Sequence, residues 1–307
     1  MPRRVGLLRM GRLGDLVMTL PAVAWLQGRP DLHCTLITDA RWQPLLPEWR
    51  TAAVDPGPGP QDAWLDLHRV PASRAALRRL RGASGAPVER VQKEDLRRRS
   101  LLFGSAWAPR WTWPERHLLA AERLMRRLGL DPGERPAPLP RLDASTPPQP
   151  GLLGLVPGAA HATKRWPLAR WVALAQRWRD EGGAVRAFTA PDEAHLLEPL
   201  RAVGVEPWPT PLGRLREGLA ACAVVVAGDT GPLHVAGALG RPVVALFGPT
   251  PPEAGFWIWG ANGTALRPAL SCAPCSLHGG DRCPRRHHRC LEDLAVETVL
   301  SAARALR

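Results

Sequence analysis

Two loops in the second half of the sequence carry residue types that can bind a diphosphate. The first spans residues 228–234, written GDTGPLH, and follows the apolar run AVVVA. If a helix begins at Thr230 and Gly231, its unpaired backbone N–H groups and its dipole attract a phosphate. His234 would then lie on the same side of that helix. The alternative is a helix that is simply capped by Asp229 or Thr230, with His234 on the surface.

The second loop, PGAAHATKRWP at residues 157–167, follows the apolar stretch LLGLV. Lys164 would offer a compact ammonium group to a phosphate, and Thr163 a hydroxyl. Lys164 is one of only two lysines in a chain that otherwise uses arginine. The alternative is a solvated lysine beside a tryptophan that merely packs. Because both loops favour an anion, each strengthens the interpretation of the other.

A third stretch, GRLGDLVMTLPA, lies near the start of the chain and contains Asp15. An aspartate at the beginning of a helix is usually a cap. If the chain binds a nucleotide sugar, the same carboxylate is well placed to act as a general base toward an acceptor hydroxyl. Both interpretations stay open at this point.

The elements that must position these residues form a strand–helix–strand alternation in each half, which predicts parallel sheets covered by helices. We expect an N-terminal Rossmann-like domain at 1–132, a proline-rich linker at 133–150 and a C-terminal Rossmann-like domain at 151–307. In such sheets the ligand binds beyond the carboxyl ends of the strands. The final helix, within LEDLAVETVLSAARALR, is a candidate to pack back on the first domain.

Composition sets limits on this interpretation. The 307 residues are 45% hydrophobic, which is enough for real cores, and no apolar run approaches the length of a membrane span. The chain begins with basic residues, as a signal peptide does, but Arg9, Arg12 and Asp15 break any apolar core after them. We therefore expect no export signal. Six cysteines in a chain this long fit a reducing cytoplasm. The first 150 residues hold 24 basic and 15 acidic residues, against 17 and 13 in the remainder, so the net charge of +13 is concentrated in the first half.

Four cysteines near the C-terminus follow the spacing C-x2-C-x7-C-x6-C. They are Cys272, Cys275, Cys283 and Cys290. Thiolates at such spacing can converge on a structural zinc ion, with three histidines nearby. Reduced thiols that pack a loop, or local disulfides, are the alternatives.

Taken together, four stretches resemble glycosyltransferase family 9, the heptosyltransferases of lipopolysaccharide synthesis. They are GRLGDLVMTLPA, LVPGAAHATKRWP, AGDTGPLHVAGALGRPVVALFGPTPP and the terminal CAPC…CP…CLEDL. The resemblance covers most of the chain. It implies an α/β GT-B fold, in which two Rossmann-like domains face each other across a cleft. It further implies that the first domain holds the acceptor and the second holds the nucleotide sugar.

The resemblance also implies roles for individual residues. Asp15 would be the catalytic base, and Lys164 would neutralise the leaving diphosphate. The nucleotide sugar would be bound by Thr163, Glu193, Asp229, Thr230, Gly231 and His234. Of these, Glu193, or Asp192 beside it, would hold the ribose, although the glycines typical of that loop are absent from TAPDEAHL.

The predicted activity is therefore the inverting transfer of a sugar from a nucleoside-diphosphate sugar to a saccharide or lipid-linked acceptor of the cell envelope. The resemblance implies heptose as the sugar and ADP as its carrier. The chain has no Asp-x-Asp pair to hold a metal, which agrees with charge neutralisation by lysine and a helix N-terminus. The basic first half fits an anionic acceptor at the inner face of the membrane, with the enzyme cytoplasmic and peripheral.

Two other functions compete with this one. A nucleotide-sugar epimerase could use the same fold. A basic protein that binds nucleic acid through the cysteine cluster and the arginine runs would show affinity that falls steeply with salt. Because the basic runs lie in the opposite half from the cysteines and no nucleic-acid motif is present, we expect no nucleic-acid partner.

Overall fold

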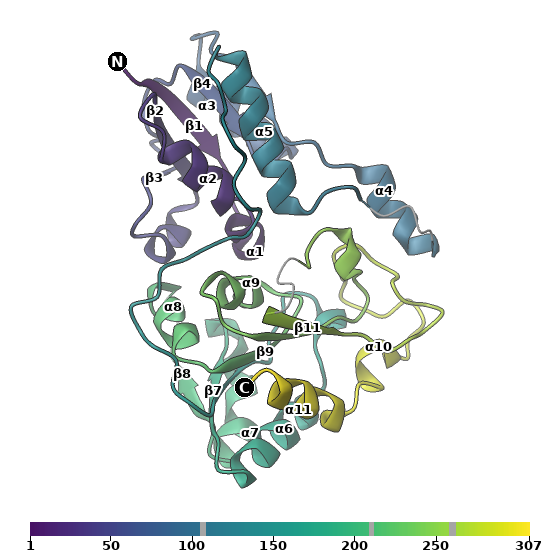
Figure 1. Cartoon of the computed structure of the whole chain (residues 1–307). Coiled ribbons are helices and arrows are strands. Elements are labelled where there is room, and N and C mark those ends of the chain that lie inside the picture. Colours follow the sequence, from purple (N-terminus) through teal and green to yellow (C-terminus); the bar gives the residue numbers. More distant parts are fainter. Residues whose placement is uncertain (105–108, 209–211, 258–261) are drawn as a thin grey trace. The chain divides into compact units, whose positions relative to one another are not determined.

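The computed structural model describes residues 1–104, 109–208, 212–257 and 262–307 (Figure 1). The chain forms two compact units. The first unit comprises Met1–Lys93 and Trp111–Arg141, and the second comprises Glu94–Arg110 and Leu142–Arg307. The last boundary between the two units, after Arg141, thus lies inside the predicted linker, residues 133–150. The segment Glu94–Arg110, which the sequence analysis gave to the N-terminal domain, instead belongs to the second unit.

The first unit is built on a five-stranded sheet in the order β3-β2-β1-β4-β5. All neighbouring strands in this sheet run parallel. The strands are β1 (Arg3–Leu8), β2 (Leu32–Thr38), β3 (Thr51–Ala53), β4 (Ala63–Asp66) and β5 (Val88–Arg90). The central strand β1 is buried from Val5 to Leu8, and its neighbour β4 is buried throughout, as expected for a parallel sheet covered on both faces.

Helices cover both faces of this first sheet. They are α1 (Leu13–Val17), α2 (Leu20–Gln27), α3 (Pro71–Arg81) and α5 (Trp113–Arg127), with a 3-10 turn, η1 (Ala40–Leu45). Two helices, α1 and α2, follow β1 in direct succession. The helix α5 begins with a capping box, in which the Glu115 carboxylate accepts from the backbone N–H of Thr112 at 2.6 Å. In α3, Ala76 and Leu77 pack with Trp64 of β4.

The second unit contains a six-stranded sheet in the order β11-β10-β9-β6-β7-β8, again with every neighbouring pair parallel. The strands are β6 (Leu152–Val156), β7 (Ala184–Phe188), β8 (Glu206–Trp208), β9 (Val224–Gly228), β10 (Val243–Leu246) and β11 (Gly263–Leu266). The short edge strands β8 and β11 were not predicted from the sequence, because neither has an apolar run that stands out from its surroundings. The predicted linker, residues 133–150, forms no helix or strand.

The helices of the second unit alternate with its strands. They are α4 (Asp95–Ser100), α6 (Leu168–Asp180), α7 (Leu197–Ala202), α8 (Leu212–Ala220), α9 (Gly231–Ala238), α10 (Arg289–Glu292) and α11 (Val296–Ala305). Four 3-10 turns accompany them: η2 (Leu101–Phe103), η3 (Ala162–Lys164), η4 (Pro191–Leu196) and η5 (Pro252–Ala254). None of the described helices is long and apolar enough to cross a lipid bilayer.

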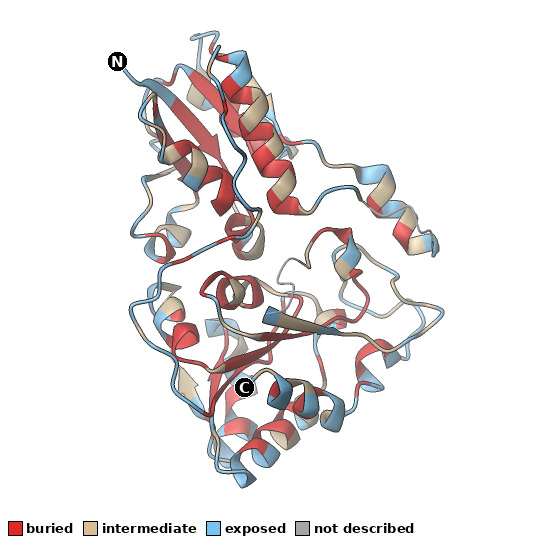
Figure 2. Ribbon diagram, in the orientation of Figure 1, coloured by how far each residue is buried: buried red, intermediate tan, exposed pale blue. Residues whose placement is uncertain are grey.

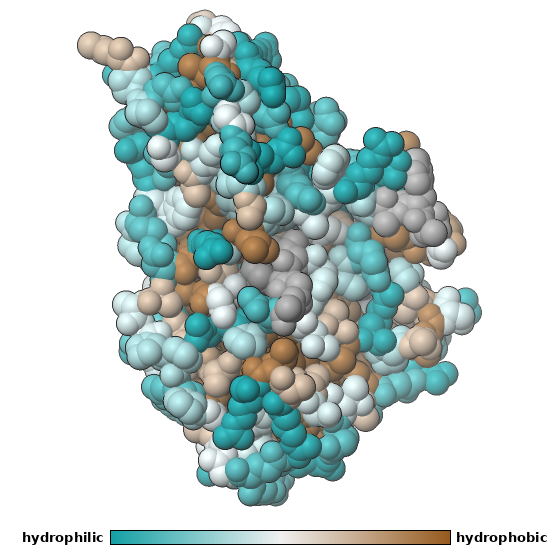
Figure 3. Space-filling model, in the orientation of Figure 1, coloured by the Kyte–Doolittle hydropathy of each residue, from teal (hydrophilic) through white to brown (hydrophobic). Residues whose placement is uncertain are grey.

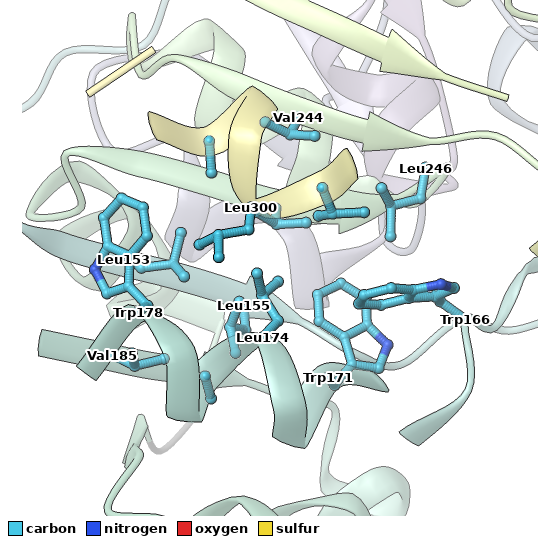
Figure 4. Close-up of a cluster of buried hydrophobic side chains, with 14 of the residues drawn as sticks. Leu153, Leu155, Trp166, Trp171, Leu174, Trp178, Val185, Val244, Leu246 and Leu300 are labelled. Atoms are coloured by element: carbon cyan, nitrogen blue, oxygen red, sulfur yellow. The ribbon is translucent and has the colours of Figure 1, made fainter. Parts of the chain in front are cut away.

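A hydrophobic core of the second unit lies between its sheet and the helices α6 and α11 (Figure 4). Three tryptophans of this core, Trp166, Trp171 and Trp178, are almost completely buried. Trp166 and Trp171 meet edge to face, with ring centroids 5.1 Å apart. Leu300 of α11 lies in the same cluster, so the final helix packs against the sheet and α6 of its own unit.

Burial is greatest along the inner strands of both sheets (Figure 2). The covering helices are buried on the side that faces a sheet and exposed on the other, as for α5 and α11. On the face shown in Figure 3, most residues of the first unit are hydrophilic. This agrees with the excess of basic residues in the first half of the sequence.

Candidate active site

Most of the predicted site residues follow the strands at which the strand order reverses, whereas Glu193 follows β7. In the second unit the chain proceeds from β6 to β7 and β8 on one side, and then returns to place β9 on the other side of β6. In the first unit, β1 and β4 have the same relation. Ligands of open parallel sheets bind beyond the carboxyl ends of such strands. Each unit therefore has a half-site, which we describe separately.

Lys164 and Asp229 meet at the reversal point of the second unit. Lys164 ends the turn η3 after β6, and Asp229 directly follows β9. The Lys164 Nζ atom lies 2.6 Å from Asp229 Oδ2, and both side chains are largely buried. This ion pair orients the Lys164 ammonium group. The structure thus brings together two predicted site residues that are 65 positions apart.

Thr250 completes this ion pair, and the sequence analysis missed it. Its hydroxyl donates to Asp229 Oδ2 at 2.9 Å, and the residue is fully buried. Asp229 therefore accepts from both Lys164 and Thr250, which fixes the carboxylate. The only available signal was the position of Thr250 in GPT, directly after the predicted strand β10.

The helix α9 begins next to this pair, at Gly231, with Thr230 as its N-cap residue. The Thr230 side chain makes no capping hydrogen bond; its hydroxyl donates instead to the Gly228 carbonyl at 3.3 Å. The alternative of a plain Thr230 cap is therefore not supported. Thr230 and Gly231 are partly exposed, so the first turn of α9 presents N–H groups to an anion.

His234 lies in the same helix but is not a surface residue. It is only 3% exposed. The interpretation of His234 as an exposed side chain is therefore wrong. Its part in binding a nucleotide sugar stays a prediction.

Glu193, rather than Asp192, faces the loop after β6. A Cβ atom at Gly158 would clash with the Glu193 carboxylate, so the two residues are in close approach. The Glu193 carboxylate also accepts from the Ala190 backbone N–H at 3.2 Å, whereas Asp192 is exposed. This contact explains why a glycine is needed in the loop PGAA. Of the two predicted carboxylates, Glu193 is the one next to the loop after β6.

Thr163 requires a correction. Its hydroxyl donates to the Gly280 carbonyl at 2.9 Å and accepts from the Gly280 N–H at 2.8 Å. The residue is 5% exposed. Because the single hydroxyl proton is used in this bond, Thr163 has no donor to offer to a phosphate. Its side chain instead holds a distant segment of the chain in place.

The half-site of the first unit contains Asp15, in the first turn of α1. Its Oδ2 atom lies 2.6 Å from Arg9 Nη2, and the Asp15 side chain is 34% exposed. Arg9 itself is only 4% exposed and also donates to the Leu67 carbonyl, after β4, at 2.7 Å. Burial lowers the pKa of Arg9, while Asp15 partly restores it. The pair orients the Asp15 carboxylate, and part of this side chain is open to solvent.

His117, on α5, gives this unit a sensitivity to acid. Burial, reinforced by the Arg9 charge, lowers the pKa of His117 to about 3. Its Nδ1 atom lies 3.0 Å from the Met18 carbonyl, which requires a proton on Nδ1 of the neutral ring.

The unfolded chain takes up a proton at His117 near pH 6.5, whereas the folded unit does not until about pH 3. The free energy of unfolding should therefore fall by about 1.4 kcal/mol for each pH unit below 6.5 at this residue. Urea unfolding at pH 7 and pH 4.5 measures this loss. His117→Gln keeps a donor for the Met18 carbonyl and should show a flatter dependence. Equal pH dependence in both proteins would refute the assignment.

The four C-terminal cysteines are all free thiols. In the described part of the chain, no group of three or more His, Cys, Asp or Glu side chains is arranged to hold a metal ion. Cys290 is buried in the core beside Leu291, whereas Cys275 is exposed. The Cys272 Sγ atom lies 3.8 Å from His287 Nε2. The zinc site stays a prediction.

Two parallel α/β units, each with polar side chains after the strands at its reversal point, match the architecture of the GT-B fold class. The model of glycosyltransferase family 9 (heptosyltransferase) matches residues 119–281, which is more than half of the chain. The chain belongs to this family, as the sequence motifs predicted.

Curated relatives match over shorter segments. The lipopolysaccharide heptosyltransferase 2 of Escherichia coli (strain K12) is 38% identical over 112 residues, which is 33% of this chain and 32% of that protein. The lipopolysaccharide heptosyltransferase 1 of Pseudomonas aeruginosa is 35% identical over 153 residues, which is 48% of this chain and 42% of that protein. The chain thus spans half or less of the length of these relatives in the matched regions.

Solved structures match over nearly the whole chain. The glycosyl transferase family 9 protein from Veillonella parvula DSM 2008 has a TM-score of 0.72 at 17% identity, and the match covers 99% of this chain and 97% of that one. The ADP-heptose LPS heptosyltransferase II of E. coli has a TM-score of 0.68 at 21% identity, with 99% and 98% covered. These likenesses confirm the predicted fold class.

Proposed function

We propose that the protein is an inverting glycosyltransferase that moves a heptose from ADP-heptose to a saccharide or lipid-linked saccharide acceptor of the cell envelope. The observation that carries this proposal is the Lys164–Asp229 pair at the start of α9, where the strand order of the second sheet reverses. A fixed ammonium group and open helix N–H groups suit a departing diphosphate.

In the proposed reaction, the acceptor hydroxyl oxygen attacks the anomeric carbon from the side opposite the diphosphate. The new C–O bond forms as the bond to the diphosphate oxygen breaks, which inverts the anomeric configuration. Asp15 takes the proton from the hydroxyl. The nucleoside diphosphate leaves with the electron pair, and its charge is stabilised by Lys164 and the first turn of α9.

The identity of the donor rests on the family and on named relatives. An E. coli heptosyltransferase of similar fold was solved with ADP, and again with ADP-2-deoxy-2-fluoro heptose. Glu193 next to the β6 loop supports a nucleoside, because a carboxylate is suited to the ribose hydroxyls. We therefore propose ADP as the carrier, with Glu193, Asp229, Thr230, Gly231 and His234 around it.

Catalysis in this scheme needs no metal ion, since Lys164 and the helix N-terminus replace its charge. Purified protein should release ADP and form a glycoside from ADP-heptose and a lipopolysaccharide-core acceptor, in EDTA as well as without it. The anomeric proton coupling in the NMR spectrum of the product reports inversion. Loss of transfer in EDTA, or retention of configuration, would contradict the scheme. Conversion of the donor without an acceptor would indicate an epimerase instead. Elemental analysis of the same preparation tests the zinc prediction.

We also propose a cytoplasmic enzyme that contacts the inner face of the membrane, where a lipid-linked acceptor is found. The segment of α4 and η2 supports this contact. Leu96 and Phe103 are 75% and 88% exposed, and a spacing of seven residues places them on one side of the segment together with the exposed Arg99. Arg98, on the other side, is buried and lies 5.5 Å from the ring centroid of Phe256. Apolar side chains beside exposed arginine suit an anionic lipid surface.

The double variant Leu96→Ser, Phe103→Ser should lose about tenfold in its partition onto phosphatidylglycerol vesicles, because two apolar side chains no longer enter the interface. Co-sedimentation measures the partition. Leu139→Ser removes another exposed apolar side chain, in the first unit, and should change nothing. Equal sedimentation of all three proteins would rule out this contact surface.

A further inference from the structure

The cysteine-rich loop, residues 272–288, lies against the loop that carries Lys164. Three hydrogen bonds join Thr163 to Gly280 across 117 positions of sequence. The Thr163 N–H donates to the Gly280 carbonyl at 3.1 Å, and the Thr163 hydroxyl bonds both the carbonyl and the N–H of Gly280. His288 adds a further contact, with Nε2 2.9 Å from the Thr163 carbonyl. The residue directly before Lys164 is therefore held on both its backbone and its side chain.

The same loop is attached to the segment after β10. The backbone N–H groups of Cys275 and Ser276 both donate to the Pro249 carbonyl, at 3.0 and 3.1 Å. The next residue, Thr250, is the one that fixes Asp229. The cysteine-rich loop thus contacts the residues adjacent to both Lys164 and Thr250.

Gly279 brings the loop into contact with the Lys164 side chain itself. A Cβ atom at Gly279 would lie 3.0 Å from Lys164 Cε, 3.2 Å from its Cγ and 3.0 Å from His161 Cβ. Gly279 also has a φ of +85°, and its N–H is held by the Ser276 hydroxyl at 2.9 Å. Only glycine meets both requirements, the left-handed backbone and the close approach.

We propose that the cysteine-rich loop positions Lys164, with Gly279 as the positioning residue that packs along its methylene chain. The proposal rests on the proposed function, because it assumes that the Lys164 ammonium binds the diphosphate. A free lysine side chain samples many rotamers, and ordering it upon binding lowers affinity. Contact with Gly279 and the ion pair with Asp229 restrict the Lys164 side chain to one rotamer. The ammonium group is therefore already in place when the nucleotide binds.

Gly279→Ala and Gly280→Ala form a matched pair for testing this. A Cβ atom at Gly280 meets nothing within 4 Å, and no left-handed φ is present there. Gly279→Ala should weaken ADP binding, measured by calorimetry, by about tenfold, the size expected for one misplaced charged hydrogen bond. Gly280→Ala should stay within about twofold of wild type, since its backbone bonds to Thr163 need no side chain. Thr163→Val provides a second route, because it removes the hydroxyl bonds to Gly280 while keeping the volume, and it should also weaken ADP binding.

The decisive readout is a double-mutant cycle with Lys164→Met. In that background Gly279→Ala should cost nothing further, because there is no ammonium group left to position. A tenfold loss that persists in the Lys164→Met background would overturn the proposal, as would unchanged ADP affinity in both Gly279→Ala and Thr163→Val. If Lys164→Met itself binds ADP like wild type, the proposed function fails at Lys164. If Lys164→Met binds ADP weakly while Gly279→Ala and Thr163→Val bind ADP like wild type, only the positioning role of the cysteine-rich loop is refuted.

Discussion

Lys164→Met should lower kcat/KM for ADP-heptose by about 10²- to 10³-fold, the range observed when one preorganised donor to a developing anion is removed. Methionine keeps the length and the apolar stem of the side chain but has no charge. The Asp229 carboxylate would then be buried without its cation, 2.6 Å from where the ammonium stood, and would repel the diphosphate. Both consequences act on the same leaving group, so ADP affinity and kcat should fall together.

Arg165→Met is the control for this variant. It removes a positive charge one position away, but Arg165 is exposed and its Nε atom is engaged with the Ala159 carbonyl at 2.8 Å. Its effect on ADP affinity should be small and should vanish in high salt, because exposed charges are screened. Lys164→Met activity within threefold of wild type, or an equal loss in Arg165→Met, would remove Lys164 from the mechanism.

Sequence patterns were sufficient for the parts of the fold that depend on local chemistry. The apolar runs predicted the central strands, and the polar loops after β6 and β9 predicted an anion site. Parallel pairing of β6 with β9, with Val156 opposite Ala227, then brings the two loops together. Two loops that follow neighbouring parallel strands lie at the same edge of the sheet, which is why the sequence could predict one anion site from both.

The contacts that refine the site could not be predicted, because they join residues far apart in the sequence. The local sequence around Thr163, residues 162–164, does not indicate that its hydroxyl donates to the Gly280 carbonyl. Likewise, Arg9 belongs to a basic N-terminal stretch and gives no sign that it is buried against Asp15. The segment Glu94–Arg110 interrupts the first unit and packs with the second, an exchange that no local pattern marks.

Asp15→Asn should reduce kcat by about 10²- to 10⁴-fold, because an amide cannot take a proton from the acceptor hydroxyl. ADP affinity should be unchanged, since Asp15 belongs to the first unit and the nucleotide-binding loops belong to the second. This separation distinguishes the variant from Lys164→Met, which lowers both quantities. Asp39→Asn is the matched control: its carboxylate also follows a strand of the first sheet, is 37% exposed and pairs with Arg41 at 2.7 Å.

Loss of stability must be separated from loss of the base, because Asp15→Asn leaves the buried Arg9 without its anionic partner. An uncompensated buried charge costs about 3–5 kcal/mol. The double variant Arg9→Met, Asp15→Asn removes both charges and should recover most of the thermal stability. It should nevertheless remain as inactive as Asp15→Asn, because the acceptor still lacks a base. If activity returns together with stability, Asp15 serves only to neutralise Arg9, and the proton must go to another group.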